Sequence, residues 1–174
     1  MTSISIPGGT LTANDRVFDY ARKMTYLAVT RNVGFQQFLV LGTGMGMMSR
    51  SLEGACIWYY GNSSYEIISV DNVHYDDAVS PVSLSRNRFY RINAEICPLE
   101  FAARYIILYD LFAGGVQMFY TADLLEWVMS NPVAYFNVIE LDDLRTIHDT
   151  AKQLNKVCTK WQVNGNIVVE VRNE

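Results

Sequence analysis

The sequence predicts a single α/β domain over residues 1–174, with a mostly parallel sheet flanked by helices. Five short apolar runs are nearly continuous rather than alternating, as expected for strands that are covered on both faces. Segments with helical spacing lie between them, and parallel strands need such crossover connections. A glycine-rich turn directly follows the first run. The five expected strands cover 38–41, 66–70, 89–92, 105–109 and 167–171.

The bulk composition is that of a globular protein. Half of the 174 residues are apolar and 18% are charged, and a chain of this length can build one sizeable core. No apolar stretch approaches the roughly 18 residues that a membrane span needs, and no secretory pattern opens the chain. The three cysteines lack a CxxC pair, which argues against a disulfide framework and a zinc site. We therefore expect a cytoplasmic protein without a metal site or membrane contact.

The formal charge of −4 bears on possible partners. Proteins that bind RNA alone usually carry a basic excess, because neutralising phosphates supplies much of their affinity. No basic surface is evident in this sequence. If the chain acts on RNA, we expect a protein partner or the remainder of a larger chain to supply one.

The first expected helix covers 13–30. Thr12 and Asp15 fit a capping box, and the apolar residues that follow recur at helical spacing. Two later segments, 50–60 and 144–161, have the composition and spacing of crossover helices.

The segment between the fourth and fifth strands is less regular. A helix is expected over 121–130, with Thr121 as its N-cap. The next two residues, Asn131 and Pro132, end the helical pattern. The segment 135–141 fits either a sixth strand or an insertion.

Glycines occupy every second position after the first strand, at Gly42, Gly44 and Gly46. Without side chains the backbone can turn sharply and let a ligand approach, and the N–H groups of the following helix would point at that ligand. A dinucleotide fingerprint would place a glycine at position 47, where Met47 stands, so an NAD-type oxidoreductase is disfavoured. A tight turn without a ligand is the alternative.

Acidic residues follow three of the expected strands. Asp71 ends the second strand, Glu95 comes shortly after the third, and Asp110 directly follows the fourth. In open parallel sheets, ligands bind outside the carboxyl ends of the strands, and a carboxylate there can accept both hydroxyls of a ribose. The sequence therefore predicts a nucleoside-binding edge made by these acids and the glycine turn.

Five short motifs in this order resemble those of S-adenosylmethionine-dependent methyltransferases with a Rossmann-like sheet. The sequence looks closest to the ribose 2′-O-methyltransferases, including the RNA-cap enzymes of nidoviruses and other RNA viruses. The motifs are Leu41-Gly-Thr-Gly44, Ser69-Val-Asp71-Asn72, Asn93-Ala-Glu95, Ile106-Ile-Leu-Tyr-Asp110 and the segment from Asn164 to Val171.

The resemblance implies S-adenosylmethionine as the cofactor. By this resemblance the glycine turn would contact the cofactor, with Gly42 and Gly44 beside the methionine part of that cofactor. Asp71 would hold the ribose and Glu95 would lie near the adenine. Asp110 would lie beside the reactive methyl group. The expected cofactor-binding set is Gly42, Thr43, Gly44, Gly46, Asp71, Asn72, Glu95 and Asp110.

The resembled family uses a lysine–aspartate–lysine–glutamate tetrad, which helps deprotonate the ribose hydroxyl. Asp110 matches the aspartate, and Lys23, or Arg16 in its place, would be the first lysine. Glu170 stands where the second lysine is expected. The fourth member has no position, and two C-terminal strands of the full methyltransferase fold are expected to be missing.

These features lead to two main hypotheses. The first is a methyltransferase, viral and acting on the ribose of capped RNA, with Asp110, Lys23 and Glu170 as its catalytic residues. The second is a catalytically inactive Rossmann-like binding or structural module, which Glu170 and the acidic charge favour. In either case the chain could be the cofactor-binding part of a larger protein.

Overall fold

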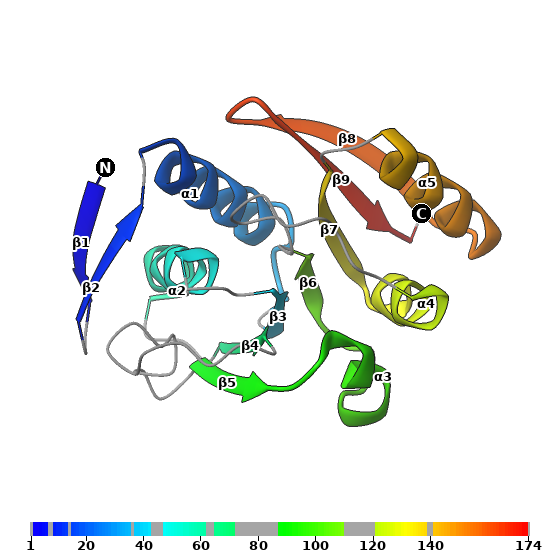
Figure 1. The fold of residues 1–174 in the computed structure, drawn as a ribbon, viewed down its shortest axis with the longest axis horizontal. Helices are drawn as coiled ribbons and strands as arrows, with labels where there is room; N and C mark the ends of the chain where they lie inside the picture. The colour runs from blue at the N-terminus through cyan, green and yellow to red at the C-terminus, as the bar shows by residue number, and fades with distance from the viewer. Residues whose placement is uncertain are drawn as a thin grey trace.

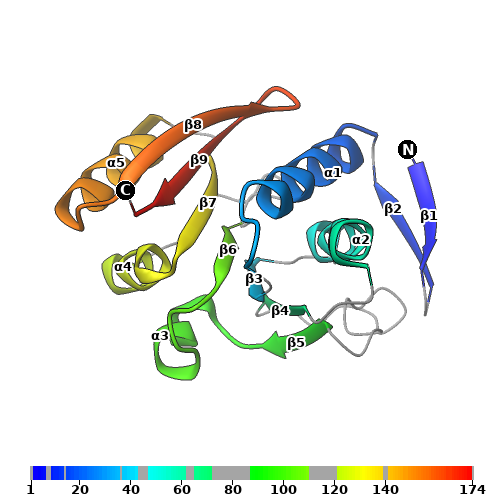
Figure 2. The same cartoon turned by 180° about the vertical axis from the view of Figure 1, so that it is seen from behind.

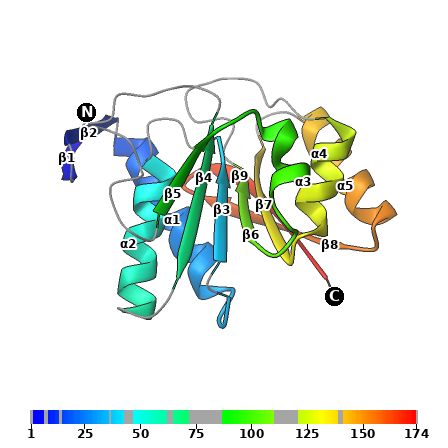
Figure 3. The same ribbon diagram turned by 90° about the horizontal axis from the view of Figure 1, so that it is seen from below.

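The computed structural model describes residues 2–6, 9–13, 15–35, 37–42, 47–61, 65–71, 87–109, 121–138 and 141–173. Its centre is a seven-stranded sheet in the order β5-β4-β3-β6-β7-β9-β8 (Figure 1). Helices α1 and α2 cover one face, and α3, α4 and α5 cover the other, which is clearest from below (Figure 3). The expectation of an α/β fold with a mostly parallel sheet is confirmed.

Five adjacent strands of this sheet run parallel to one another. They are β3 (Gln37–Leu41), β4 (Glu66–Asp71), β5 (Asn87–Arg91), β6 (Ile106–Tyr109) and β7 (Val133–Val138). Every residue of β6 is buried, and so are all but the first of β3, because helices pack on both faces. The chain runs outward from β3 to β5, then returns to β6 and β7 on the other side. This reversal creates a switch point between β3 and β6.

The helices close two apolar layers around the sheet. On one face lie α1 (Asp15–Thr30) and α2 (Met47–Tyr60). On the other lie α3 (Cys97–Glu100) with the 3₁₀ turn η3 (Ala94–Ile96), α4 (Ala122–Ser130) and α5 (Leu141–Gln153). Alternate side chains of the strands enter one layer or the other, so both faces of the sheet are apolar.

Two cap expectations have different outcomes. The Thr121 side chain accepts a hydrogen bond from the Leu124 amide at 3.1 Å, which confirms it as the N-cap of α4. Thr12, whose side chain is outside the described part, lies in the strand of a separate two-stranded hairpin, where it pairs with Ser3, and α1 begins three residues later at Asp15. That hairpin consists of β1 (Thr2–Ile6) and β2 (Gly9–Ala13) and stands beside the two helices of its face (Figure 2).

The expectation that the C-terminal strands are missing was wrong. The segment expected to be one helix over 144–161 divides into α5 and a strand, β8 (Val157–Val163). Asn155, with a φ of 56°, lies between them in the left-handed region and helps end the helical path. The last strand, β9 (Asn166–Arg172), lies antiparallel between β7 and β8 and completes the seven-stranded sheet.

Candidate functional site

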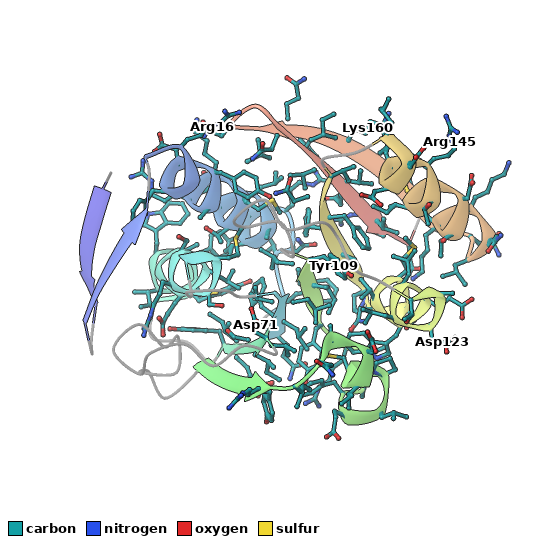
Figure 4. The ribbon with its side chains drawn as sticks, viewed as in Figure 1. Arg16, Asp71, Tyr109, Asp123, Arg145 and Lys160 are labelled. Atoms are coloured by element: carbon teal, nitrogen blue, oxygen red, sulfur yellow. The ribbon has the colours of Figure 1, made fainter. Side chains whose placement is uncertain are left out.

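The carboxyl ends of β3 and β4 lie side by side at one edge of the sheet. Leu41 is in register with Val70, so the next residues, Gly42 and Asp71, are neighbours. The Gly42 amide donates to the Val70 carbonyl at 2.9 Å, which continues the strand pairing to the edge. Figure 4 shows Asp71 and Tyr109, at the ends of β4 and β6, in the central part of the molecule. We call this edge, made by Gly42, Asp71 and Tyr109, the rim.

Gly42 turns the chain away from β3 with a φ of +79°. This left-handed conformation is easily adopted only by glycine, and Gly42 itself is buried. Helix α2 begins at Met47, so its amino end is directed to the same edge. Thr43, Gly44 and Gly46 lie outside the described residues.

Asp71 is the last residue of β4, and its side chain is half-buried. A carboxylate at this position, one strand away from the glycine turn, is placed to accept hydrogen bonds from the paired hydroxyls of a ribose. Glu95 is exposed in η3, four residues after β5 ends. Asn72 and Asp110 are outside the described part of the chain.

A small pocket adjoins the rim under the middle of α1. Its volume is about 10 Å³, which is room for about one water molecule. The lining is mostly apolar and aromatic, with Asn137 as a partly exposed amide. The lining residues are Tyr20, Met24, Met48, Leu108, Tyr109, Tyr135, Asn137 and Val168. Tyr20 and Met24 belong to the apolar residues whose helical spacing predicts the first helix, and no sequence signal marks Asn137.

Glu170 lies inside the sheet layer rather than at the rim. Its carboxylate is completely buried and accepts hydrogen bonds from Arg31 (2.8 and 3.0 Å), Arg172 (2.9 Å) and the Tyr135 hydroxyl (2.7 Å). Glu170 lies on β9, and β7 stands between β9 and β6, the strand that Asp110 follows. The arrangement ties the end of α1 to β7 and β9.

The electrostatics of this cluster favour a permanently charged Glu170. Burial alone would raise the pKa of the carboxyl, but the hydrogen bonds from Arg31, Arg172 and Tyr135 outweigh it and hold the pKa below its usual value. Burial also raises the pKa of the Tyr135 hydroxyl, which therefore stays protonated and donates. A carboxylate held this way is a weak proton acceptor.

Lys23 and Arg16 are exposed on α1, next to the turn between β8 and β9. The Lys23 ammonium donates to the Asn164 side-chain oxygen at 3.2 Å, and the Asn164 amide donates to the Arg16 carbonyl at 3.1 Å. Lys23 therefore lies on the same helix as the pocket residues Tyr20 and Met24, but on the flank that faces the β8–β9 turn.

The described residues offer little for other kinds of chemistry. Burial raises the pKa of both Cys56 and Cys97 to about 12, so neither thiol ionises readily at neutral pH. Over the described ranges, no three His, Cys, Asp or Glu side chains come together as a potential metal site. Nor does any helix in them combine the length and apolar character that crossing a membrane requires.

Comparison with known proteins adds evidence on the fold. No protein-family model matches the sequence, and no curated protein matches it either. Solved structures do match. Human methyltransferase-like protein 13 in complex with SAH has 17% identity and a TM-score of 0.60, over 89% of this chain and 82% of that one. A putative RNA methyltransferase from Pyrococcus horikoshii has 16% identity and a TM-score of 0.55, over 87% and 80%.

The chain has the methyltransferase fold. A probable spermidine synthase from Corynebacterium glutamicum matches as well, with 16% identity and a TM-score of 0.62, over 97% of this chain and 67% of that one. The methyltransferase fold therefore carries more than one activity among these matches, and the reaction has to be argued from the site.

Proposed function

We propose that this chain is an S-adenosylmethionine-dependent methyltransferase. The observation that carries the proposal is the adjacency of Gly42 and Asp71 at the carboxyl ends of neighbouring parallel strands. The positive φ of Gly42 turns the chain sharply at this edge. The half-buried carboxylate beside it suits a ribose. The residues present thus fit an adenosyl ligand.

Each part of the rim has a role in this proposal. Asp71, with Asn72, would accept hydrogen bonds from the ribose hydroxyls, and Glu95 would lie near the adenine. Gly42 and the rest of the glycine turn would flank the methionine part. The cofactor, when bound, supplies an activated methyl group on its sulfonium.

We further propose that the acceptor is the ribose 2′-hydroxyl of a capped RNA, and that the protein is viral and acts in the host cytoplasm. The five sequence motifs support this acceptor, as does the fold shared with a putative RNA methyltransferase. A hydroxyl reacts well only when a positioned group takes its proton. Asp110, directly after β6, is the proposed central catalytic residue, and Lys23 on α1 would be the first lysine of the resembled tetrad.

One observation favours a second candidate, a cofactor-binding module without catalysis. Glu170 replaces the second lysine of the resembled tetrad, and its carboxylate is buried and accepts four hydrogen bonds from three residues. This geometry gives Glu170 a structural role. A methyltransferase of this kind would then rely on Asp110, on Lys23, or on a group from a protein partner or a larger chain.

Two assays separate these alternatives. Calorimetric titration with S-adenosylhomocysteine, S-adenosylmethionine and NAD is expected to show saturable binding of the first two and none of NAD. Methyl transfer is then measured on capped RNA and on the same RNA already methylated at the ribose. We expect transfer only to the first, and background transfer by Asp110→Ala. Binding without transfer to any RNA would support the non-catalytic module, and NAD binding alone would contradict both.

A further inference from the structure

The basic residues of the chain are concentrated in two segments of the sequence, and these segments lie together at one corner of the fold. Segments 15–31 and 154–173 hold seven of the 14 basic residues but only three of the 18 acidic ones. The first segment forms α1 and the second forms β8 and β9. The basic residues are Arg16, Arg22, Lys23, Arg31, Lys156, Lys160 and Arg172. An overall charge of −4 thus conceals a locally positive corner.

Side-chain contacts join the two segments into one surface. Lys23 donates to Asn164 in the β8–β9 turn at 3.2 Å, and the Arg31 guanidinium lies 4.7 Å from the centre of the Trp161 ring on β8. Figure 4 shows Arg16 near the turn between β8 and β9, whereas Asp123 lies away from it on α4. Lys160 lies opposite Val169, so its side chain points to the face of the sheet that α5 covers. We call Arg16, Lys23, Arg31 and Arg172, which lie on the α1 side, the basic margin.

The acids of this corner do not cancel its charge: with Asp15, Asp19 and Glu170 counted, the two segments keep a net charge of +4. Glu170 is completely buried and shared between two arginines, so Arg31 and Arg172 together keep one net positive charge. Asp19 pairs with Arg22, which lies outside the basic margin. Lys23 uses one of its three donors on Asn164. The margin therefore keeps donors and charge on its exposed side.

The margin leads to the rim along α1. Tyr20 and Met24, on the same helix as Arg16 and Lys23, line the pocket beside the rim. The hydrogen bonds to Glu170 and the contact with Trp161 fix the Arg31 guanidinium. A fixed guanidinium can stack on an unpaired base as well as bind a phosphate. Cations that follow a backbone, with a stacking group among them, are typical of single-strand binding.

We propose that the basic margin binds the backbone of single-stranded RNA and directs one end of it toward the rim. The inference rests on the RNA acceptor proposed above. Charge complementarity favours this occupant, because RNA is a polyanion and the rest of the chain carries a net negative charge. The margin then supplies the positive surface that the overall composition does not reveal.

The test compares two double variants that lose the same charge on opposite faces of the sheet. Arg16→Ala/Lys23→Ala removes exposed side chains of the margin. Arg145→Ala/Lys152→Ala is the matched control, because both side chains are exposed on α5, which covers the other face. Affinity for a fluorescently labelled single-stranded RNA of about 20 nucleotides is measured by anisotropy at several salt concentrations.

The margin variant is expected to bind RNA about tenfold more weakly than the wild type. The slope of log K against log salt should fall by about 1.4, since each phosphate contact of a single strand contributes about 0.7. The control variant should change neither quantity. Arg16→Glu/Lys23→Glu, which reverses the charge, should weaken binding further, and circular dichroism checks that each variant is folded.

Calorimetry with S-adenosylhomocysteine on the same samples separates the two proposals. Normal cofactor binding with equal RNA affinity in both double variants would overturn the margin and leave the cofactor site standing. Absence of cofactor binding in all samples, with loss of RNA affinity in the margin variant alone, would overturn the cofactor site and leave the margin standing. Failure of the wild type to bind RNA, or preference for duplex RNA or for vesicles of anionic lipid, would also overturn the margin.

Discussion

Asp71→Ala is expected to weaken the binding of S-adenosylhomocysteine by roughly 10²–10⁴-fold. A hydrogen bond to a charged group contributes about 1.5–3 kcal/mol, and the proposal gives Asp71 two such bonds to ribose hydroxyls. Asp71→Asn, which keeps one acceptor oxygen, should have a smaller effect. Isothermal titration calorimetry with the purified variants measures both.

Glu66 provides the matched control, because it starts the strand that Asp71 ends. Glu66→Ala removes an acidic side chain from the same strand at the opposite edge of the sheet, so the affinity for the cofactor product should stay within about twofold of the wild type. Equal losses in the two variants would point to a general effect on β4. An unchanged affinity in Asp71→Ala would remove Asp71 from the site.

Glu170→Gln is expected to lower the free energy of unfolding by about 3 kcal/mol. The substitution keeps the shape of the side chain but leaves two arginines facing a neutral group in a buried site. The estimate is at the low end for a broken buried ion pair, because Arg31 and Arg172 are themselves partly exposed. For a chain of this size the midpoint of thermal unfolding should fall by roughly 6–12 °C.

Two comparisons make this result specific. Asp19→Ala breaks an exposed ion pair with Arg22 and should change the stability by less than about 0.5 kcal/mol. At a temperature where Glu170→Gln is folded, its affinity for S-adenosylhomocysteine should equal that of the wild type, since Glu170 does not lie at the rim. Selective loss of methyl transfer without loss of stability would instead make Glu170 catalytic.

The lowered pKa of Glu170 also sets how stability depends on pH. Because the pKa is lower in the folded state than its ordinary value of 4.5, the contribution of Glu170 is fully present above that value. It is lost as the pH falls through the lower, folded-state pKa. On acidification below about pH 4.5 the wild type should therefore lose stability more steeply than Glu170→Gln, as thermal unfolding across pH would show.

The sequence predicted the parallel strands β3, β4, β5 and β6, because burial on both faces leaves continuous apolar runs. The run at 167–171 is a strand as expected but belongs to the antiparallel β9, and β7 overlaps the segment 135–141, which fits either a strand or an insertion. The prediction failed at the C-terminal hairpin, where the apolar positions of 144–158 happen to continue a helical spacing. The signal that could have found β8 is the dipeptide Asn164-Gly165, since both residues have positive φ values of 50° and 83°. Two such residues between alternating strands are typical of a tight hairpin turn.

The site was predictable where it depends on strand ends and not where it depends on tertiary contacts. Gly42 and Asp71 are neighbours because parallel strands place their carboxyl ends at one edge. The environment of Glu170 could not be read from the sequence, because its partner Arg31 is 139 residues away. The basic margin was missed for a similar reason: its two segments lie at opposite ends of the chain.

A crystal structure of the protein with S-adenosylhomocysteine tests the central claim most directly. The ligand should lie across the carboxyl ends of β3 and β4, with its ribose hydroxyls within hydrogen-bond distance of Asp71 and its methionine part against the turn after Leu41. A ligand bound elsewhere, or a rim closed by packed side chains in crystals soaked at saturating ligand, would contradict the account.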